Sequence, residues 1–364
     1  MSLQKNLEQL VKFKTVTGNY QECQAVLDWI KKEIKGLPLY IKQLNSNKFQ
    51  SLVITTQKTK KPIMWLMAHL DVVPGKEELF VPQVKNSKMF GRGANDMKFA
   101  IACYLELLKE LGNDLSKYNF GVMLTTDEEF GGFDGAGFLT KQGFVSQVVF
   151  LPDGEGAWQI EKSAKGVLDL LVESKGKSAH GSQPWLGKNA IENLLNFINT
   201  LKNIFPKEPC RIKSHYHATM NVGKIEGGEA INKVPGSAKA FIDVRFTPET
   251  SMVSVIKSIQ MVKKNFNGIS VKVIVSGHSS KIDPKNHFVQ TFSKIAYDNF
   301  KIKTTFAVSH GSSDARFFAV KNIPVILINP EGDGAHSDKE WIDLKDLERF
   351  YFVMKKFVQQ TTKI

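Results

Sequence analysis

The segment "PIMWLMAHLDVVPG", residues 62–75, decides the fold, because its long apolar run predicts a strand buried on both faces. Two polar residues, His69 and Asp71, appear at alternate positions before Pro74 and Gly75 end the run. Alternate residues of a strand point to the same side, so we expect an imidazole and a carboxylate together at the carboxyl end of this strand. Unpaired buried charge is costly, so this pair indicates a candidate functional site.

Helical and strand patterns alternate on both sides of this segment. The expected helices cover residues 6–16, 22–37 and 97–111, and the expected strands cover residues 51–56, 62–73, 120–126 and 147–153. Such alternation is typical of a mostly parallel sheet with helices on both faces. We therefore predict an α/β fold.

The pattern changes at residue 166, where a block with an α+β pattern begins. Its expected strands cover residues 166–176, 218–228, 237–246 and 269–277, and its expected helices cover residues 189–205 and 254–266. The α/β pattern returns after residue 278, with helices expected at 287–300 and 344–360. We predict one catalytic domain, residues 1–165 and 279–364, interrupted by an inserted domain, residues 166–278.

The composition argues against several classes of protein. The 364-residue chain has a formal net charge of +13, but its lysines are spread along the sequence, so we predict a basic surface and no nucleic-acid partner. No apolar run reaches the ~20 residues of a membrane span, so no membrane partner is expected. The three cysteines, Cys23, Cys103 and Cys210, lie too far apart for a disulfide framework and favour a cytoplasmic location.

Other strand patterns also end in candidate ligands. Glu128 and Glu129 follow the strand at 120–126, Asp153 ends the strand at 147–153, and His336 follows an apolar run at 323–330. In open α/β sheets, ligands bind outside the carboxyl ends of the strands. Asp96, in "GRGANDMK", lies where a glycine-containing loop meets the apolar helix at 97–111.

Two histidines with several carboxylates suit zinc, manganese or cobalt, and two adjacent metals need a bridging carboxylate between them. A site of this kind activates water and polarises a carbonyl, while a free carboxylate takes the proton. Each residue has a simpler alternative. Asp96 could cap its helix, the glutamates could be solvated loop charges, and the histidines could form ordinary structural hydrogen bonds. Their recurrence at four strand ends favours a metal hydrolase. The chain has no H-E-x-x-H, G-x-S-x-G or P-loop motif.

Seven motifs resemble the M20 metallopeptidase family, which includes zinc-dependent aminoacylases, acetylornithine deacetylases, succinyl-diaminopimelate desuccinylases and glutamate carboxypeptidases. They occur in the family's order over nearly the whole chain: "MAHLDVVPG", "GRGANDMK", "TTDEEFGG", "LPDGE", "SAHGSQPWLGKNAI", "INKVPGSAKAFIDVRF" and "GAHSDKEWI". The resemblance implies a zinc-peptidase-like catalytic domain with an inserted lid and dimerisation domain.

The resemblance also implies a role for each candidate residue. Five residues would hold two zinc ions: His69 and Asp153 the first, Glu129 and His336 the second, and Asp96 as the bridge. Glu128 would be the general base, and Asp71 would orient the His69 imidazole. Some relatives use a glutamate in the Asp153 loop, so Glu155 stays open as an alternative ligand.

In the inserted domain, the resemblance makes His180 the histidine that reaches a neighbouring subunit's active site and helps to hold the substrate oxyanion. Asn232, Arg245 and Ser312 fall on substrate-binding positions. Arg245 could instead form a plain surface ion pair with Asp243, and Ser312 could cap a helix. We interpret a further pair of histidines, His215 and His217, as surface residues without a function.

Together these residues predict a cytoplasmic homodimeric two-zinc amidohydrolase, with cobalt or manganese as substitutes. Its substrate would be an N-acyl amino acid or a short peptide with a free carboxylate. A succinyl-diaminopimelate desuccinylase, an acetylornithine deacetylase and a metal-binding scaffold without turnover are the alternatives. Two departures weaken the desuccinylase interpretation: "AKG" at residues 164–166 where desuccinylases tend to carry two basic residues, and "ELFVPQV" after the first motif.

Overall fold

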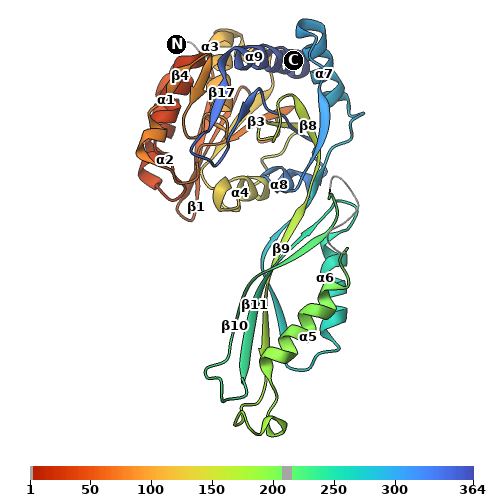
Figure 1. Cartoon of the computed structure of the whole chain (residues 1–364). Coiled ribbons are helices and arrows are strands. Elements are labelled where there is room, and N and C mark those ends of the chain that lie inside the picture. The colour runs from red at the N-terminus through yellow and green to blue at the C-terminus, as the bar shows by residue number, and fades with distance from the viewer. Residues whose placement is uncertain (1–2, 207–214) are drawn as a thin grey trace. The chain divides into compact units, whose positions relative to one another are not determined.

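The computed structural model describes residues 3–206 and 215–364, and the chain forms two compact units (Figure 1). Unit 1 contains Met1–Lys162, Lys281–Ala307 and Ser313–Ile364, and unit 2 contains Ser163–Ser280 and Val308–Ser312. The thiols of Cys23 and Cys103 are buried and free, whereas Cys210 lies outside the described residues.

Unit 1 is built on a six-stranded sheet with the order β1-β2-β6-β3-β7-β15. The strands are β1 (Tyr40–Ser46), β2 (Phe49–Thr55), β6 (Phe120–Thr125), β3 (Met64–His69), β7 (Val148–Leu151) and β15 (Val325–Leu327). The last four strands in this order are parallel, and β2 runs antiparallel to β6 and β1 to β2. The predicted mostly parallel sheet is therefore confirmed.

Helices cover both faces of this sheet, as predicted. They are α1 (Leu3–Lys12), α2 (Tyr20–Glu33), α3 (Lys98–Leu111), α4 (Ala136–Lys141), α7 (His287–Phe300), α8 (Ala315–Ala319) and α9 (Leu344–Thr362). Helices α3 and α9 lie on one side, and α4 and α8 lie on the other (Figure 1). No helix in the described parts of the chain is long and apolar enough to cross a membrane.

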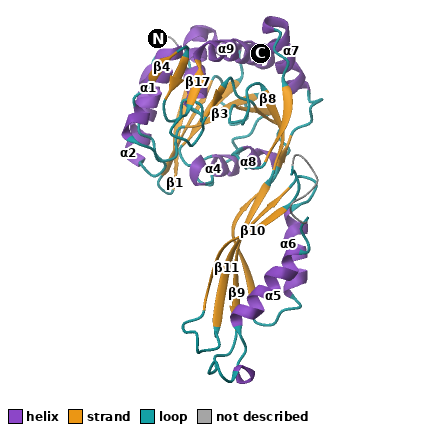
Figure 2. Ribbon diagram, in the orientation of Figure 1, coloured by secondary structure: helices purple, strands orange, loops and turns teal. Residues whose placement is uncertain are grey.

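Two smaller sheets complete the secondary structure around the main sheet (Figure 2). One contains β13 (Ser280–Lys281), β8 (Gln159–Ala164) and β14 (Thr305–Ser309), and the other contains β16 (Gly332–Asp333), β17 (Trp341–Asp343), β5 (Lys88–Phe90) and β4 (Gln83–Lys85). Short 3₁₀ helices cover Glu77–Phe80, Gly112–Lys117, Glu128–Phe130 and Pro184–Leu186. The second of these small sheets carries the chain segments that lead toward Asp96 and away from His336.

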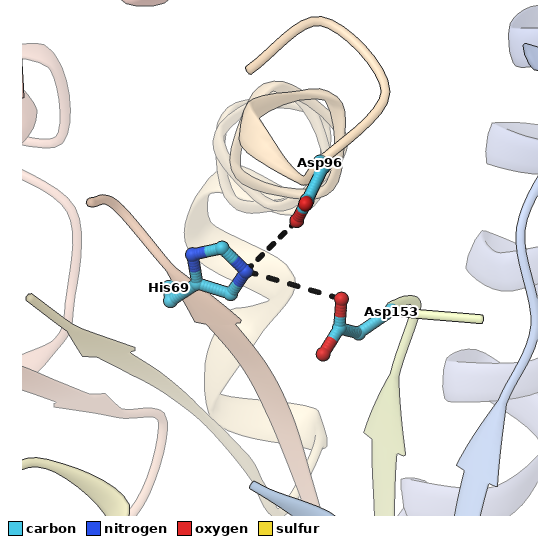
Figure 3. Close-up of side chains that lie close together, drawn as sticks. All are labelled: His69, Asp96 and Asp153. Atoms are coloured by element: carbon cyan, nitrogen blue, oxygen red, sulfur yellow. Dashed lines mark ion pairs between the residues drawn. The ribbon is translucent and has the colours of Figure 1, made fainter. Parts of the chain in front are cut away.

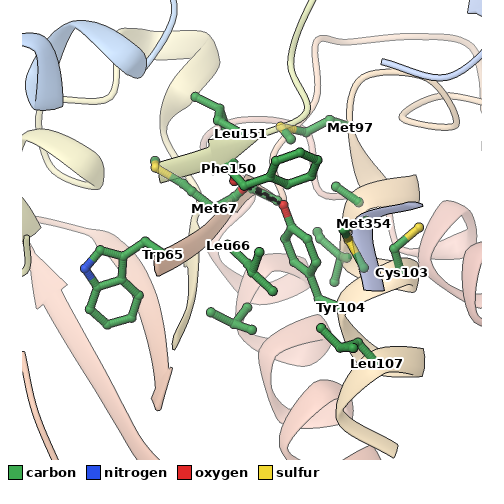
Figure 4. Close-up of a cluster of buried hydrophobic side chains, with 14 of the residues drawn as sticks. Trp65, Leu66, Met67, Met97, Cys103, Tyr104, Leu107, Phe150, Leu151 and Met354 are labelled. Atoms are coloured by element: carbon green, nitrogen blue, oxygen red, sulfur yellow. Dashed lines mark hydrogen bonds between the residues drawn. The ribbon is translucent and has the colours of Figure 1, made fainter. Parts of the chain in front are cut away.

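The pairing of β3 with β7 ends earlier along β3 than its pairing with β6. Strands β3 and β7 pair only as far as Leu66 and Phe150, whereas β3 and β6 pair as far as His69 and Thr125. Just beyond Leu66, the hydroxyl of Tyr104, on α3, donates to the Met67 carbonyl oxygen at 2.9 Å (Figure 4). The tyrosine thus satisfies a strand carbonyl where the sheet pairing stops, and β3 and β7 can separate toward their carboxyl ends.

We expect Tyr104→Phe to lower the free energy of unfolding by about 1–3 kcal/mol, because it leaves the buried Met67 carbonyl without its donor. Chemical denaturation monitored by circular dichroism measures this change. Tyr40→Phe is the matched control, because Tyr40 is 52% exposed and its hydroxyl can bond to water instead. Equal stability of both variants would contradict the proposed role of the Tyr104 hydroxyl.

Unit 2 is an antiparallel four-stranded sheet with two helices packed on it (Figure 2). The sheet order is β10 (Thr219–Gly227), β11 (Ser237–Phe246), β9 (Gly166–Lys175) and β12 (Ile269–Gly277), and the helices are α5 (Ala190–Lys202) and α6 (Met252–Lys263). Every second residue of β11 is buried, as expected for a strand with one face in a core. Unit 2 therefore has its own hydrophobic core.

Candidate metal centre

The predicted ligands converge because their strands are neighbours. Strand β3 ends at His69, Glu129 follows β6, Asp153 follows β7, and His336 follows β15. These four strands are adjacent and parallel in the order β6-β3-β7-β15, so their carboxyl ends share one edge of the sheet. Asp96 comes to the same edge from the loop before α3.

The first ligand group contains His69, Asp96 and Asp153, and its ligand atoms all lie within 4.8 Å of one another. The His69 Nε2 atom lies 3.0 Å from Asp96 Oδ1 and 3.9 Å from Asp153 Oδ1 (Figure 3). The imidazole is 1% exposed, and both carboxylates are mostly buried. One nitrogen and two carboxylates therefore face a common point.

The second group contains Asp96, Glu129 and His336. The His336 Nε2 atom lies 3.0 Å from Asp96 Oδ2 and 3.2 Å from Glu129 Oε1. Asp96 belongs to both groups, and each of its two oxygens faces a different histidine. Helix α3 has Met97 as its N-cap, without a side-chain cap hydrogen bond, so capping does not account for Asp96.

The donor atoms fit a pair of divalent metals. Nδ1 of His69 lies 2.9 Å from the main-chain oxygen of Asp71, and that oxygen can only accept a hydrogen bond. Nδ1 therefore donates to this oxygen, and Nε2, which faces the two carboxylates, is the nitrogen left to bind a metal. Imidazole nitrogens with carboxylate oxygens are ligands of zinc, manganese and cobalt, and a hydrogen-bonded second nitrogen is usual for a metal-binding histidine.

The electrostatics of the centre also favour a cation. Burial alone would lower the pKa of His69, but hydrogen bonds to Asp153 and Asp96 raise it well above its usual value. Hydrogen bonds to Asp96 likewise raise the pKa of His336 to about 9. The carboxylates thus stabilise positive charge at both histidines, which is the same attraction that a bound metal would experience.

Glu128 and Glu129 are adjacent in sequence but occupy different environments. Glu129 is a member of the second ligand group, whereas Glu128 belongs to neither of the two groups found among the described residues. Burial raises the pKa of Glu129 to about 7 and the pKa of Glu128 well above its usual value. Glu128 is therefore a carboxylate beside the centre with an increased affinity for a proton, which is a useful property in a general base.

Asp71 contributes to the centre in a way that the sequence pattern did not indicate. The predicted strand at 62–73 ends at His69, because Val72 pairs instead with the N-terminal segment at Val16. The main-chain oxygen of Asp71 is the nearer partner of the imidazole, and the carboxylate lies 3.7 Å from Nδ1. That carboxylate accepts hydrogen bonds from the main-chain amides of Glu128 and Glu129, at 3.2 and 3.1 Å. Asp71 therefore joins the strand that carries His69 to the loop that carries both glutamates.

The alternative ligand Glu155 lies outside the two groups. Asp153 lies two residues after the end of β7, and its amide donates to the Leu151 oxygen at 2.9 Å, which turns the chain at the strand end. Glu155 is exposed and belongs to neither ligand group in the described part of the chain. The geometry therefore favours Asp153 over Glu155 for the first metal.

In unit 2 the structure brings His180 and Asn232 together. The amide of Gly181 donates to the main-chain oxygen of Asn232 at 2.7 Å, and His180 forms a β-bridge with Lys233. The amide of Ser182 donates to His180 Nδ1 at 3.2 Å, so a neutral ring carries its proton on Nε2. His180 is exposed and can therefore present an N–H donor to a ligand.

The structure tests simpler interpretations of three further residues in unit 2, Arg245, Ser312 and His217. Arg245 forms the ion pair with Asp243 that the sequence left open, with Nη2 lying 2.9 Å from Oδ2. Ser312 does not cap the following helix α8, whose N-cap residue is Asp314. The interpretation of His217 as a surface residue was wrong, since it is only 9% exposed.

Two interactions around the centre were not predicted. The Thr17 hydroxyl donates to the Asp71 carboxylate at 2.9 Å. A buried ion pair joins Arg92, in the segment before Asp96, to Glu340, with Nη1 and Oε2 2.8 Å apart. Thr17 carries no sequence signal. For Glu340 the only signal is its position, four residues after His336 and directly before the apolar pair Trp341 and Ile342.

Comparison with known proteins decides the family. The sequence matches the profile of peptidase family M20/M25/M40 over residues 65–360. The chain belongs to this family. It is therefore a hydrolase, and the family resemblance seen in the motifs is confirmed.

Its M20 relatives align with it over nearly their whole length. Succinyl-diaminopimelate desuccinylases from Sulfurovum sp. (strain NBC37-1) and Rickettsia massiliae (strain Mtu5) are 25% and 27% identical, and each alignment covers at least 97% of this chain and 98% of the relative. A Staphylococcus aureus tripeptidase has a TM-score of 0.79 at 22% identity, covering 99% of this chain and 97% of its own. An M20 metallo-carboxypeptidase from Sulfolobus solfataricus has a TM-score of 0.75 at 17% identity, covering 99% of each chain. These structures show the same fold.

Proposed function

We propose that this chain is a two-zinc amidohydrolase that cleaves the amide bond of an N-acyl amino acid or a short peptide with a free carboxylate. The observation that carries the proposal is the position of Asp96, whose two oxygens each lie 3.0 Å from a different histidine. A single carboxylate shared by two ligand groups is the arrangement that a bridged pair of metals requires. Manganese or cobalt could replace zinc with the same ligands.

The residues divide the work of the reaction. Two zinc ions, held by the two groups that share Asp96, would supply the positive charge that acidifies water and polarises the substrate carbonyl. Glu128 accepts the proton of the attacking water and then delivers it to the leaving amine. The Asp71 carboxylate accepts hydrogen bonds from the amides of both Glu128, the proposed base, and Glu129, the proposed ligand, and so fixes their main chain.

The relatives support two substrate classes that share this chemistry. Removal of a succinyl group and cleavage of a peptide both break an amide bond. The identity of 25–27% over nearly the full chain favours a succinyl-diaminopimelate desuccinylase as the second candidate. Against it, residues 164–166 read "AKG", with one basic residue where desuccinylases tend to carry two. A turnover screen of the zinc-loaded protein with N-succinyl-diaminopimelate, N-acetylornithine, other N-acetyl amino acids, dipeptides and tripeptides tests these candidates. A lack of turnover throughout would favour a metal-binding scaffold.

Unit 2 supports a homodimer as part of the proposal. Strand β12 lies at an edge of the sheet, and three consecutive apolar residues on it, Val273, Ile274 and Val275, are 37%, 46% and 38% exposed. Val253 and Met261 on α6 are also exposed, at 74% and 60%. An open strand edge with apolar side chains readily pairs with the same edge of a second copy. The cytoplasmic location stays a prediction from the sequence.

We expect the wild-type chain to bind two zinc ions and His336→Ala to bind only one tightly, because only the second group contains His336. Equilibrium dialysis followed by elemental analysis measures the stoichiometry. His278→Ala, which changes an exposed histidine of unit 2, should still bind two ions. Saturation of the wild type at one ion, with no change in His336→Ala, would eliminate the bridged centre.

A further inference from the structure

Glu340 is a buried carboxylate that collects hydrogen bonds from the loop that carries Asp96. Its Oε1 accepts from the main-chain amides of Asn95 at 2.9 Å and Asp96 at 3.1 Å. Its Oε2 accepts from the amide of Gly93 at 3.0 Å and from Arg92 Nη1 at 2.8 Å. The side chains of Glu340 and Arg92 are 1% and 2% exposed. Four donors from five consecutive residues therefore converge on one carboxylate inside unit 1.

These contacts constrain the direction of the Asp96 side chain. Because the amides of three loop residues must all point toward Glu340, the main chain of the loop is held in one conformation. The carboxylate of Asp96 then lies 3.0 Å from both His69 and His336. Arg92 forms an ion pair with Glu340 at 2.8 Å, so the two buried side chains offset each other's charge.

We infer that Glu340 is a positioning residue, which holds Asp96 where its two oxygens can bridge two metal ions. The inference rests on the proposed two-metal centre and adds to it a residue that touches neither metal nor substrate. Groups that orient metal ligands typically contribute 10–100-fold to metal affinity or activity. The amide of Asp96 itself is among the donors, so Glu340 acts on the bridge directly.

Glu340→Gln is the isosteric test. The amide keeps one acceptor oxygen but turns the other into a donor, which then faces the N–H groups of the loop. We expect the affinity for both zinc ions to fall by roughly 10–100-fold, as measured by competition with a chromophoric chelator. Thr56→Val is the matched control: it removes a buried hydroxyl that bonds to Tyr118 and Phe120 elsewhere in unit 1, and it should bind zinc as the wild type does.

A second comparison separates an effect on Asp96 from an effect on the neighbouring His336. In the His336→Ala background only the first ligand group remains, and Glu340→Gln should still weaken zinc binding there. No further weakening would overturn the inference, because Glu340 would then act only on the segment that it shares with His336 and not on Asp96. Thermal denaturation of the metal-free proteins verifies that each variant is folded.

The remaining outcomes are also decisive. Should Glu340→Gln fail to fold, Glu340→Asp retains both oxygens on a shorter side chain, and its zinc affinity should fall below that of the wild type. Wild-type affinity in a folded Glu340 variant overturns the inference and leaves the proposed function standing. A wild-type chain that binds fewer than two zinc ions overturns the proposed function, and the inference falls with it.

Discussion

Glu128→Gln should reduce turnover by about 10²–10⁴-fold or more while both zinc ions stay bound. Glutamine has nearly the shape of glutamate, but it cannot accept the proton of the attacking water. The substitution spares the metals because Glu128 belongs to neither ligand group in the described parts of the chain. It also spares the loop, since the hydrogen bond to Asp71 comes from the Glu128 main chain. The expected result is an inactive enzyme with a complete metal centre.

Glu129→Gln is the natural counterpart, because it changes the adjacent residue in the same way. Glu129 Oε1 lies 3.2 Å from His336 Nε2 within the second ligand group, so this variant should lose zinc affinity as well as activity. Elemental analysis and initial rates, measured on the same preparations, separate the two effects. An active Glu128→Gln enzyme that has lost zinc would mean that the two glutamates have exchanged roles.

His180→Ala should lower kcat by about 10²–10³-fold without changing the zinc content, which is the effect of losing one donor to a developing oxyanion. The Ser182 amide donates to Nδ1, so Nε2 of the exposed ring is the nitrogen that can carry the donated proton. All five proposed metal ligands belong to unit 1, whereas His180 belongs to unit 2. His278→Ala serves as the control, because it removes another exposed histidine of unit 2.

Mixing two inactive variants tests whether His180 serves the active site of the partner subunit. In a dimer of one His180→Ala chain and one Glu128→Gln chain, one site combines an intact Glu128 with the partner's intact His180. Random exchange makes about half of the dimers mixed, and each has one complete site, so about a quarter of wild-type activity should return. If subunit exchange is verified and no activity returns, His180 acts within its own chain or has no catalytic role.

The sequence by itself indicated the α/β class and the candidate ligands of the proposed metal centre. Buried parallel strands have a strong local pattern, and a carboxylate appears two residues after the end of each strand, at Asp71 after β3, Asp127 after β6 and Asp153 after β7. Because the carboxyl ends of parallel strands share one edge, this local pattern was enough to predict that the ligands converge. Edge strand β1 escaped prediction because it is largely exposed and polar, and so lacks a hydrophobic pattern.

Only the tertiary structure decided how these residues are held. The pattern of His69 and Asp71 at alternate positions placed the Asp71 carboxylate beside the imidazole, and in the fold it lies 3.7 Å from Nδ1. The main-chain oxygen of Asp71 is nearer to Nδ1, and the carboxylate also accepts hydrogen bonds from the amides of Glu128 and Glu129. Glu340 bonds to the amide of Asp96, a residue 244 positions earlier in the chain. Main-chain donors are the same for almost every residue type, so the sequence around Asp96 carries no sign of where their acceptor lies. Which carboxylate reaches them is set by the packing of segments far apart in the chain.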